Sequence, residues 1–295
     1  LFQTYGNKPY KRQYHSQIIH KNKIIVFGGC YLEEYCFNNV YRLDLSTKEW
    51  TLITTKGSIP SPRYGHSALI YGDLMIIYGG AKDSTIIGSI YYLNLNSYIW
   101  EMKNFGGYKA VPRYNHKSVL DNEGNMLVFG GRTGVALTEE LLKFDLLREK
   151  VEKIEYNEKE NMSIEESEFK AKDNIVNMYP TARENFIMVY HKGKIFIIGG
   201  YQTNGSASNK EIYIYDVKSN KSKIFITEGF LPEKEFNVES SAFYLVKNTL
   251  YIIGGCSSKF KLCSSMTSKL NLDTLEWIKI QNNNSVLVNV QGAAA

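Results

Sequence analysis

A Gly-Gly pair that recurs at nearly regular intervals constrains this 295-residue sequence more than any other feature. Each pair closes a short apolar run, and successive pairs are 51, 51, 69 and 55 residues apart. The pairs are Gly28-Gly29, Gly79-Gly80, Gly130-Gly131, Gly199-Gly200 and Gly254-Gly255. Self-similarity of this kind indicates one structural unit present in five copies, which must stack together to bury their apolar faces.

Three further markers keep their distance from the Gly-Gly pair in most copies. An arginine precedes the pair, a histidine follows that arginine by three residues, and a tryptophan lies further on, six residues after an Asp or Asn. These markers are Arg12, Arg63, Arg113 and Arg183; His15, His66 and His116; and Trp50, Trp100 and Trp277. In the fourth and fifth copies Phe186 and Ser241 replace the histidine, so we expect these two copies to pack less regularly.

Each copy contains four segments that have the character of β-strands. In the second copy these segments are residues 66–71, 74–78, 89–95 and 99–103. They are rich in β-branched and aromatic residues, alternate in polarity, and are separated by Gly, Asn, Asp and Lys turns. Four antiparallel strands per unit, repeated radially, predict an all-β protein with the architecture of a β-propeller.

The markers together resemble the kelch repeat. The second copy carries Gly57-x-x-Pro60-x-x-Arg63-x-x-His66-Ser67, then an apolar strand that ends at Gly79-Gly80, and then Trp100. The Gly and Pro before the arginine are similar to the kelch subgroup outside the BTB-adaptor proteins. The resemblance extends from Leu1 to about Gln281 and implies a kelch-type β-propeller of four-stranded antiparallel blades.

The ends of the chain bear on the number of blades. We expect a single propeller domain with repeats at about 12–62, 63–112, 113–182, 183–237 and 238–281, and with stubs at 1–11 and 282–295. Because residues 1–16 align with 52–67, Leu1–Tyr5 is expected to be the outer strand of a blade that is otherwise absent. Six blades are therefore the most favoured count, and five or seven stay open. The chain starts without Met, so we expect a fragment of a longer protein.

Composition argues against nucleic acid and membrane as partners. The net charge is only +5 and the basic residues are scattered, whereas a nucleic-acid-binding protein typically carries a dense basic stripe. No apolar run is long enough for a membrane helix, and no signal-peptide pattern is present. Four cysteines in a chain of this length do not suggest a disulfide framework. We expect buried free thiols at Cys30, Cys36, Cys256 and Cys263, and a cytoplasmic location.

The connections between strands differ in length on the two faces of the expected ring. On one face every turn is short, whereas the loops after the Gly-Gly pairs and the connections between blades vary, as binding loops do. The candidate partner-binding residues on this variable face are Tyr31, Tyr35, Phe37, Lys82, Tyr108, Arg132, Tyr201, Gln202, Asn204, Lys259 and Phe260, with Tyr10, Lys11 and Lys109 in the connections. Tyrosine and arginine offer large contact areas with a polar end, which suits protein recognition.

The repeated residues are better interpreted as architecture, because a functional site occupies one place on a ring. The arginines and histidines are therefore expected to hold turns, with the histidines neutral and hydrogen-bonded. A metal is not expected, since zinc ligands must converge on one ion. The Gly-Gly pairs lack the spacing of a phosphate-binding loop. No cofactor is predicted.

Residues 152–178 form an acidic insertion between the third and fourth repeats. The segment from Glu152 to Asp173 contains eight acidic residues and four lysines. Its low apolar content predicts a surface loop, and Ser163-x-x-Glu166 is a capping-box pattern that favours a short helical turn. The insertion either has no role or gates the variable face.

The resemblance implies a non-catalytic interaction module that presents one face to a protein or peptide and is monomeric as a fragment. Such domains are often fused to others, and a serine/threonine phosphatase is one candidate for the remainder of a longer protein. The alternative is a propeller enzyme or small-molecule-binding protein, either mutarotase-like or metal-dependent. No Ser/His/Asp or paired-carboxylate set can be assembled from the sequence, and fold alone does not assign chemistry.

Overall fold

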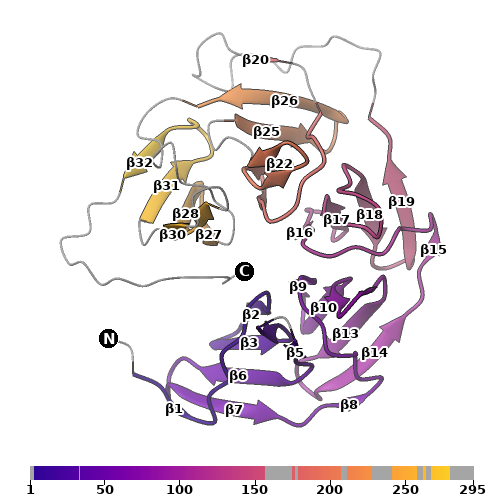
Figure 1. Cartoon of the computed structure of the whole chain (residues 1–295), viewed down its shortest axis with the longest axis vertical. Helices are drawn as coiled ribbons and strands as arrows, with labels where there is room; N and C mark the ends of the chain where they lie inside the picture. Colours follow the sequence, from indigo (N-terminus) through magenta and orange to yellow (C-terminus); the bar gives the residue numbers. More distant parts are fainter. Residues whose placement is uncertain are drawn as a thin grey trace.

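The computed structural model describes residues 3–32, 34–156, 175–176, 179–206, 211–227, 241–257, 262–263 and 267–279. The regular elements within these residues are all β-strands. They form five sheets arranged around a common axis, as Figure 1 shows in the view down that axis. The five sequence repeats thus correspond to five blades of a β-propeller.

Each blade contains four antiparallel strands that follow one another in chain order from the axis outward. They are β2 (Ser16–His20), β3 (Lys23–Phe27), β6 (Val40–Asp44) and β7 (Glu49–Ile53) in the first blade; β9 (Ser67–Tyr71), β10 (Leu74–Tyr78), β13 (Ile90–Asn94) and β14 (Ile99–Lys103) in the second; β16 (Lys117–Leu120), β17 (Met126–Phe129), β18 (Leu141–Asp145) and β19 (Lys150–Ile154) in the third; β21 (Ile187–His191), β22 (Lys194–Ile198), β25 (Glu211–Asp216) and β26 (Lys221–Ile226) in the fourth; and β27 (Ala242–Val246), β28 (Thr249–Ile253), β31 (Thr267–Asn271) and β32 (Trp277–Lys279) in the fifth. In the second blade the four expected segments agree with the observed strands to within one residue.

The second strand of a blade shows why the pattern folds in this way. In β10, Met75 and Ile77 pack toward the first blade, whereas Ile76 and Tyr78 pack toward the third. Both faces of this strand are buried, so its sequence is a continuous apolar run. Four such inter-blade clusters join the first blade to the second, the second to the third, the third to the fourth, and the fourth to the fifth.

A short outermost strand, which the sequence analysis did not predict, extends four of the blades. β1 (Tyr5–Gly6), β8 (Lys56–Gly57) and β15 (Gly106–Gly107) run parallel to β7, β14 and β19, respectively. β20 (Ile175–Val176) instead runs antiparallel to β26. The expectation for Tyr5 is therefore wrong: it lies on the rim of the first blade, because Tyr5 is opposite Glu49 of β7. Leu1 and Phe2 lie outside the described residues.

The expected sixth blade is also absent from the described residues, which form five. The N-terminal stub contributes β1 to the first blade, and the C-terminal stub at 282–295 lies outside the described range. Of the acidic insertion, residues 152–154 belong to β19 and residues 175–176 form β20, so these residues are part of blade strands. Residues 157–174 and 177–178, with the expected helical turn, lie outside the described residues.

The fourth blade keeps the ring contact between blades although Phe186 replaces the histidine, and it differs from the first three in its antiparallel outermost strand. Phe186 packs edge-on against Phe129 of the third blade, with ring centroids 5.5 Å apart. His66 packs in the same way against Phe27, at 5.3 Å. An aromatic ring at this position therefore preserves the contact between blades, whether or not it carries nitrogen.

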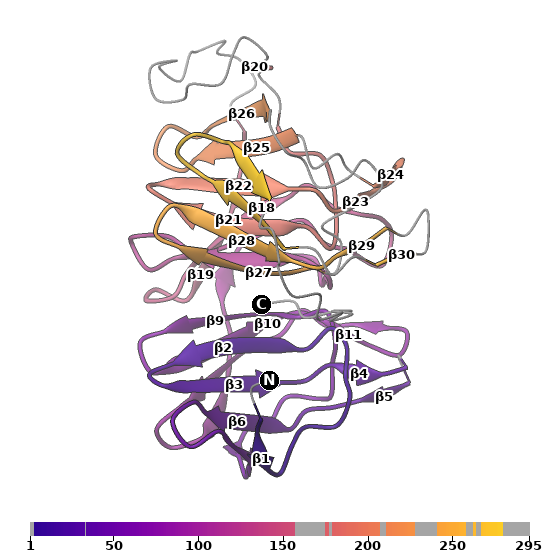
Figure 2. The same cartoon turned by 90° about the vertical axis from the view of Figure 1, so that its left-hand side faces the viewer.

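The loops after the Gly-Gly pairs form small hairpins on one side of the ring. These hairpins are β4 (Cys30–Tyr31) with β5 (Tyr35–Cys36), β11 (Ala81–Lys82) with β12 (Thr85–Ile86), β23 (Tyr201–Gln202) with β24 (Gly205–Ser206), and β29 (Cys256–Ser257) with β30 (Leu262–Cys263). Figure 2 shows them at the right-hand edge of the molecule. We call this side the variable-loop face and the opposite side the short-turn face.

Candidate functional site

The variable-loop face is held together near the axis by a chain of backbone hydrogen bonds between blades. Gly65 N donates to Tyr14 O at 3.1 Å, and Asn115 N donates to Gly65 O at 2.7 Å. Asn185 N then donates to Asn115 O at 3.2 Å. All four residues have a positive φ, a conformation that Gly and Asn adopt most easily. The loops of four successive blades are therefore fixed relative to one another.

The repeated arginines stabilise the same loops through hydrogen bonds to backbone carbonyl groups. Arg63 is buried, and its guanidinium donates to Gly79 O and to Ser61 O, each at 3.1 Å. Arg12, Arg113 and Arg183 make the same contact with the first glycine of their own pairs. Because buried backbone carbonyls need a donor, each arginine satisfies groups that the sharp Gly-Gly bend leaves unpaired. These contacts support the structural role that we infer for the repeated arginines.

The repeated histidines lie between blades. His66 Nε2 lies 2.8 Å from Ser16 Oγ, and His116 Nε2 lies 2.9 Å from Ser67 Oγ. Burial and then the charge of Arg63 lower the pKa of His66 to about 3, so its imidazole is neutral at neutral pH. A Cβ on Gly28 would approach His66 Cε1 to 2.7 Å, which explains why glycine occupies this position. Within the described residues no three His, Cys, Asp or Glu side chains are placed to hold a metal ion.

Four of the predicted partner-facing aromatic residues gather on the first blade. The ring of Tyr10 meets that of Tyr31 edge-on at 5.1 Å and lies 6.4 Å from that of Phe37. Tyr35 faces Tyr31 across the β4–β5 hairpin and is 65% exposed. Arg12 lies 4.3 Å from the centre of the Phe37 ring, a cation–π contact that fixes the base of this group. We call Tyr10, Tyr31, Tyr35 and Phe37 the first-blade aromatic cluster.

A disulfide closes the hairpin that carries this cluster. Cys30 and Cys36 are bonded to each other, so the expectation of free thiols is wrong for both residues. They are partners in the β4–β5 ladder, which brings their Cα atoms within 3.9 Å. Sequence spacing could not show this, because the pairing depends on the tight hairpin. Cys256 and Cys263 oppose each other in the same register of β29–β30.

A row of tyrosines extends the surface from the first blade to the third. The rings of Tyr14 and Tyr64 are 6.1 Å apart, and those of Tyr64 and Tyr114 are 5.9 Å apart. Each ring is partly exposed. Their sequence positions do not single them out as binding residues, because they stand beside the repeated arginines and histidines, which are interpreted as architecture.

The row ends at an ion pair in which one predicted residue takes part. Arg132 donates from Nε and Nη2 to Oε1 of Glu184, at 3.1 and 2.6 Å. Glu184 also accepts from Asn115 Nδ2 at 3.0 Å and forms a β-bridge with Tyr201. The structure thus brings Arg132 and Tyr201 together through Glu184, a residue that the sequence analysis did not select.

The other predicted residues are distributed along the same face. Tyr108 donates to Glu140 Oε1 at 2.6 Å, and Gln202 donates to Thr181 Oγ1 at 2.7 Å, so both have partners within the protein. Lys82 is partly exposed and Asn204 is exposed. Lys259 and Phe260 lie outside the described residues. Val135, which was not predicted, is 98% exposed at the tip of the third blade's loop.

On the short-turn face, ion pairs join neighbouring blades. His20 and Lys21 of the first blade lie 2.6 and 3.1 Å from Asp73 Oδ1 of the second. A hydrogen bond from Asn96 and those from Lys21 and His20 lower the pKa of Asp73 to about 2. His191 and Lys192 of the fourth blade meet Asp273 of the fifth in the same way.

The radial sheets and the arginine contacts with Gly-Gly carbonyls define a kelch-type β-propeller. The KLHDC2/KLHL20/DRC7 Kelch-repeats domain matches residues 1–169 and 90–295, which together cover the whole chain. The chain belongs to this family of kelch-repeat domains. The resemblance drawn from the repeats is therefore confirmed. Within the described residues, no helix is long and apolar enough to cross a membrane.

Curated relatives match over about a quarter of the chain. Kelch domain-containing protein 3 of Homo sapiens is 40% identical over 79 residues, which are 26% of this chain and 21% of that protein. Acyl-CoA-binding domain-containing protein 5 of Arabidopsis thaliana is 33% identical over 81 residues, 27% of this chain and 12% of that protein. Rho GTPase-activating protein gacHH of Dictyostelium discoideum is 35% identical over 75 residues, 25% of this chain and 5% of that protein. The match thus spans about a fifth or less of each relative.

Proposed function

We propose that this chain is a protein-interaction module that binds a protein or peptide through its variable-loop face. Kelch propellers are typical of such modules, and the relatives combine matching segments with differently named domains and activities. The observation that carries the proposal is the first-blade aromatic cluster, in which Tyr10 and Tyr35 are 58% and 65% exposed on a braced hairpin.

The cluster has the chemistry of an interaction hot spot. Tyrosine supplies a large apolar area and a hydroxyl group, and it loses little side-chain entropy when it is immobilised. Because Arg12 supports Phe37 and a disulfide closes the hairpin, less ordering cost remains for the binding step. The row of Tyr14, Tyr64 and Tyr114 continues the surface toward Arg132. A partner segment with an apolar anchor beside a polar backbone fits this arrangement.

Selection of peptides on the 295-residue chain tests the proposal. Random peptides displayed on phage are selected against the chain, and the Kd of each enriched peptide is measured by calorimetry. The double change Tyr31→Ser and Tyr35→Ser should weaken binding by about tenfold or more, because hot-spot rings contribute most of the affinity. The control is Leu147→Ser on the short-turn face, which removes a large hydrophobic side chain that is 75% exposed. Loss of binding in the control, with none in the double variant, would overturn the proposal.

A further inference from the structure

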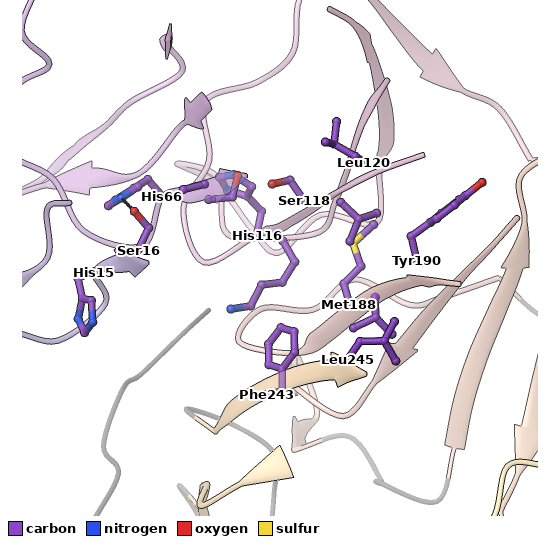
Figure 3. Close-up of a pocket in the computed structure, with 15 residues that line it drawn as sticks. His15, Ser16, His66, His116, Ser118, Leu120, Met188, Tyr190, Phe243 and Leu245 are labelled. Carbon is purple, nitrogen blue, oxygen red and sulfur yellow. Dashed lines mark hydrogen bonds between the residues drawn. The ribbon is translucent and has the colours of Figure 1, made fainter. Parts of the chain in front are cut away.

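The axis of the propeller contains a cavity that the proposed interaction face does not use. Its volume is about 340 Å³, within the range of small-molecule sites. Inner strands of all five blades contribute to its wall, as the close-up in Figure 3 shows. The wall has a polar side with His15, His66 and His116, and an apolar side with Met188, Phe243 and Leu245.

Among the described residues of this wall, Lys117 is the only one with a side chain that is charged at neutral pH. It occupies the position that Ser16 and Ser67 hold in the first two blades, where each serine is bonded to a histidine of the next blade. In the next blade Phe186 replaces that histidine, so it offers Lys117 no polar partner. Among the contacts of the described residues, the Lys117 ammonium lies 5.6 Å from the centre of the Phe243 ring.

The surroundings of Lys117 lack a compensating negative charge. None of the described residues that line the cavity is Asp or Glu. The three histidines of the wall are neutral and cannot supply one, since burial lowers the pKa of each. Ser118, the next residue, has a buried hydroxyl group that makes no hydrogen bond within the described part of the chain. The Lys117 ammonium and the Ser118 hydroxyl group thus line a cavity whose described wall contains no anionic group.

We propose that this axial cavity binds a small organic anion. A carboxylate or phosphate group accepts from Lys117, and a short apolar body packs on Met188, Phe243 and Leu245. An anion supplies the counter-charge that the described wall lacks. The site is separate from the first-blade aromatic cluster, so the inference does not depend on the proposed partner binding.

Calorimetric titration of the 295-residue chain with three probes tests the site. Butyrate presents a carboxylate on an apolar body, inorganic phosphate presents the other head group alone, and butyramide has the shape of butyrate without its charge. At least one anion should bind, and butyramide should not. Binding by butyrate alone assigns a carboxylate ligand, and binding by phosphate alone assigns a phosphate ligand. Equal binding of butyrate and butyramide, or no binding of either anion, would overturn the inference.

Two variants locate the binding. Lys117→Met should weaken anion binding by about tenfold or more, as loss of one member of a buried charge pair does. Lys218→Met removes the same charge from an exposed turn and should leave binding unchanged. If both variants bind the anion as the unmodified chain does, Lys117 has no role and the inference fails.

If Lys117→Met does not fold, an NMR titration of Lys117 in the unmodified chain tests whether the anion binds beside it. Burial lowers the pKa of Lys117 to about 8, which side-chain NMR titration can follow at Nζ. Because an anion binds the charged form, saturation with the anion should raise this pKa. A pKa that stays the same at saturating anion would contradict the proposal.

Discussion

At the scale of the residue, the repeated arginine holds the backbone of the Gly-Gly bend in each of the first four blades. Arg63→Met keeps the apolar stem of the side chain but leaves Gly79 O and Ser61 O without their donor. We expect the free energy of unfolding to fall by about 2–4 kcal/mol, the range for breaking a buried hydrogen-bond network. Urea unfolding measures this change. Arg148→Met is the control, because that side chain is 81% exposed, and equal losses in both variants would contradict the structural role.

The lowered pKa of His66 predicts that the free energy of unfolding depends on pH. Its pKa is about 3 in the folded protein and 6.5 in the unfolded chain, so the unfolded chain binds more protons between these values. The contribution of neutral His66 to the free energy of unfolding is therefore fully present above pH 6.5, and it falls by a few kcal/mol as the pH approaches 3.

His66→Phe isolates this effect. Phenylalanine keeps the ring contact with Phe27, as Phe186 does with Phe129 in the fourth blade. Chemical denaturation at a series of pH values should show a shallower loss in the variant between pH 6.5 and 3. Parallel curves for the two proteins would contradict the assignment. Asp73 contributes to both proteins equally, which is why the difference between the curves is the informative quantity.

At the scale of the element, the disulfide in the β4–β5 hairpin should affect both stability and peptide binding. Cys36→Ser opens the disulfide with Cys30, and the loop-closure estimate for so short a loop gives a loss of stability of about 2 kcal/mol at most. The larger effect should be on binding, because Tyr31 and Tyr35 then lose their fixed register. We expect selected peptides to bind about tenfold more weakly.

The reductant dithiothreitol provides the matched measurement. It should weaken peptide binding to the unmodified chain as much as Cys36→Ser does, and it should have no further effect on that variant. A reductant effect that persists in Cys36→Ser would indicate that another bond is responsible.

The elements that could be predicted from sequence are those with a physical period. Strands such as Leu74–Tyr78 carry an apolar run between turns, so their bounds agree with the structure to within a residue. β8 has two residues and no apolar signal, because its only link to the blade is a parallel backbone pairing with β14. Position on the variable-loop face was predictable for Tyr31 and Tyr35, since it follows from topology. The disulfide and the Arg132–Glu184 pair were not, because they depend on contacts between distant or tightly folded segments.

At the scale of the whole molecule, five blades are joined in succession by buried clusters between neighbours. The sequence predicted this stacking because each copy repeats the same markers. It did not predict the axial cavity, because Lys117 stands in an inner strand whose pattern resembles that of its neighbours. Lys117 has no histidine partner because Phe186 stands in the fourth blade where the first three blades have a histidine. This contact is between two blades, so a single repeat does not reveal it. The variable-loop face carries the first-blade aromatic cluster and the Arg132–Glu184 ion pair, and the short-turn face carries ion pairs such as His20–Asp73.

Hydrogen exchange of the chain with and without a selected peptide tests the central claim most directly, since it maps the occupied face without any substitution. The account predicts slower exchange of backbone amides in the β4–β5 hairpin and in the two loops that contain Tyr14 and Tyr64. It predicts no change in the turns at Asp73 and Leu147 on the short-turn face. Protection confined to those turns, with the β4–β5 hairpin unchanged, would contradict recognition by the variable-loop face.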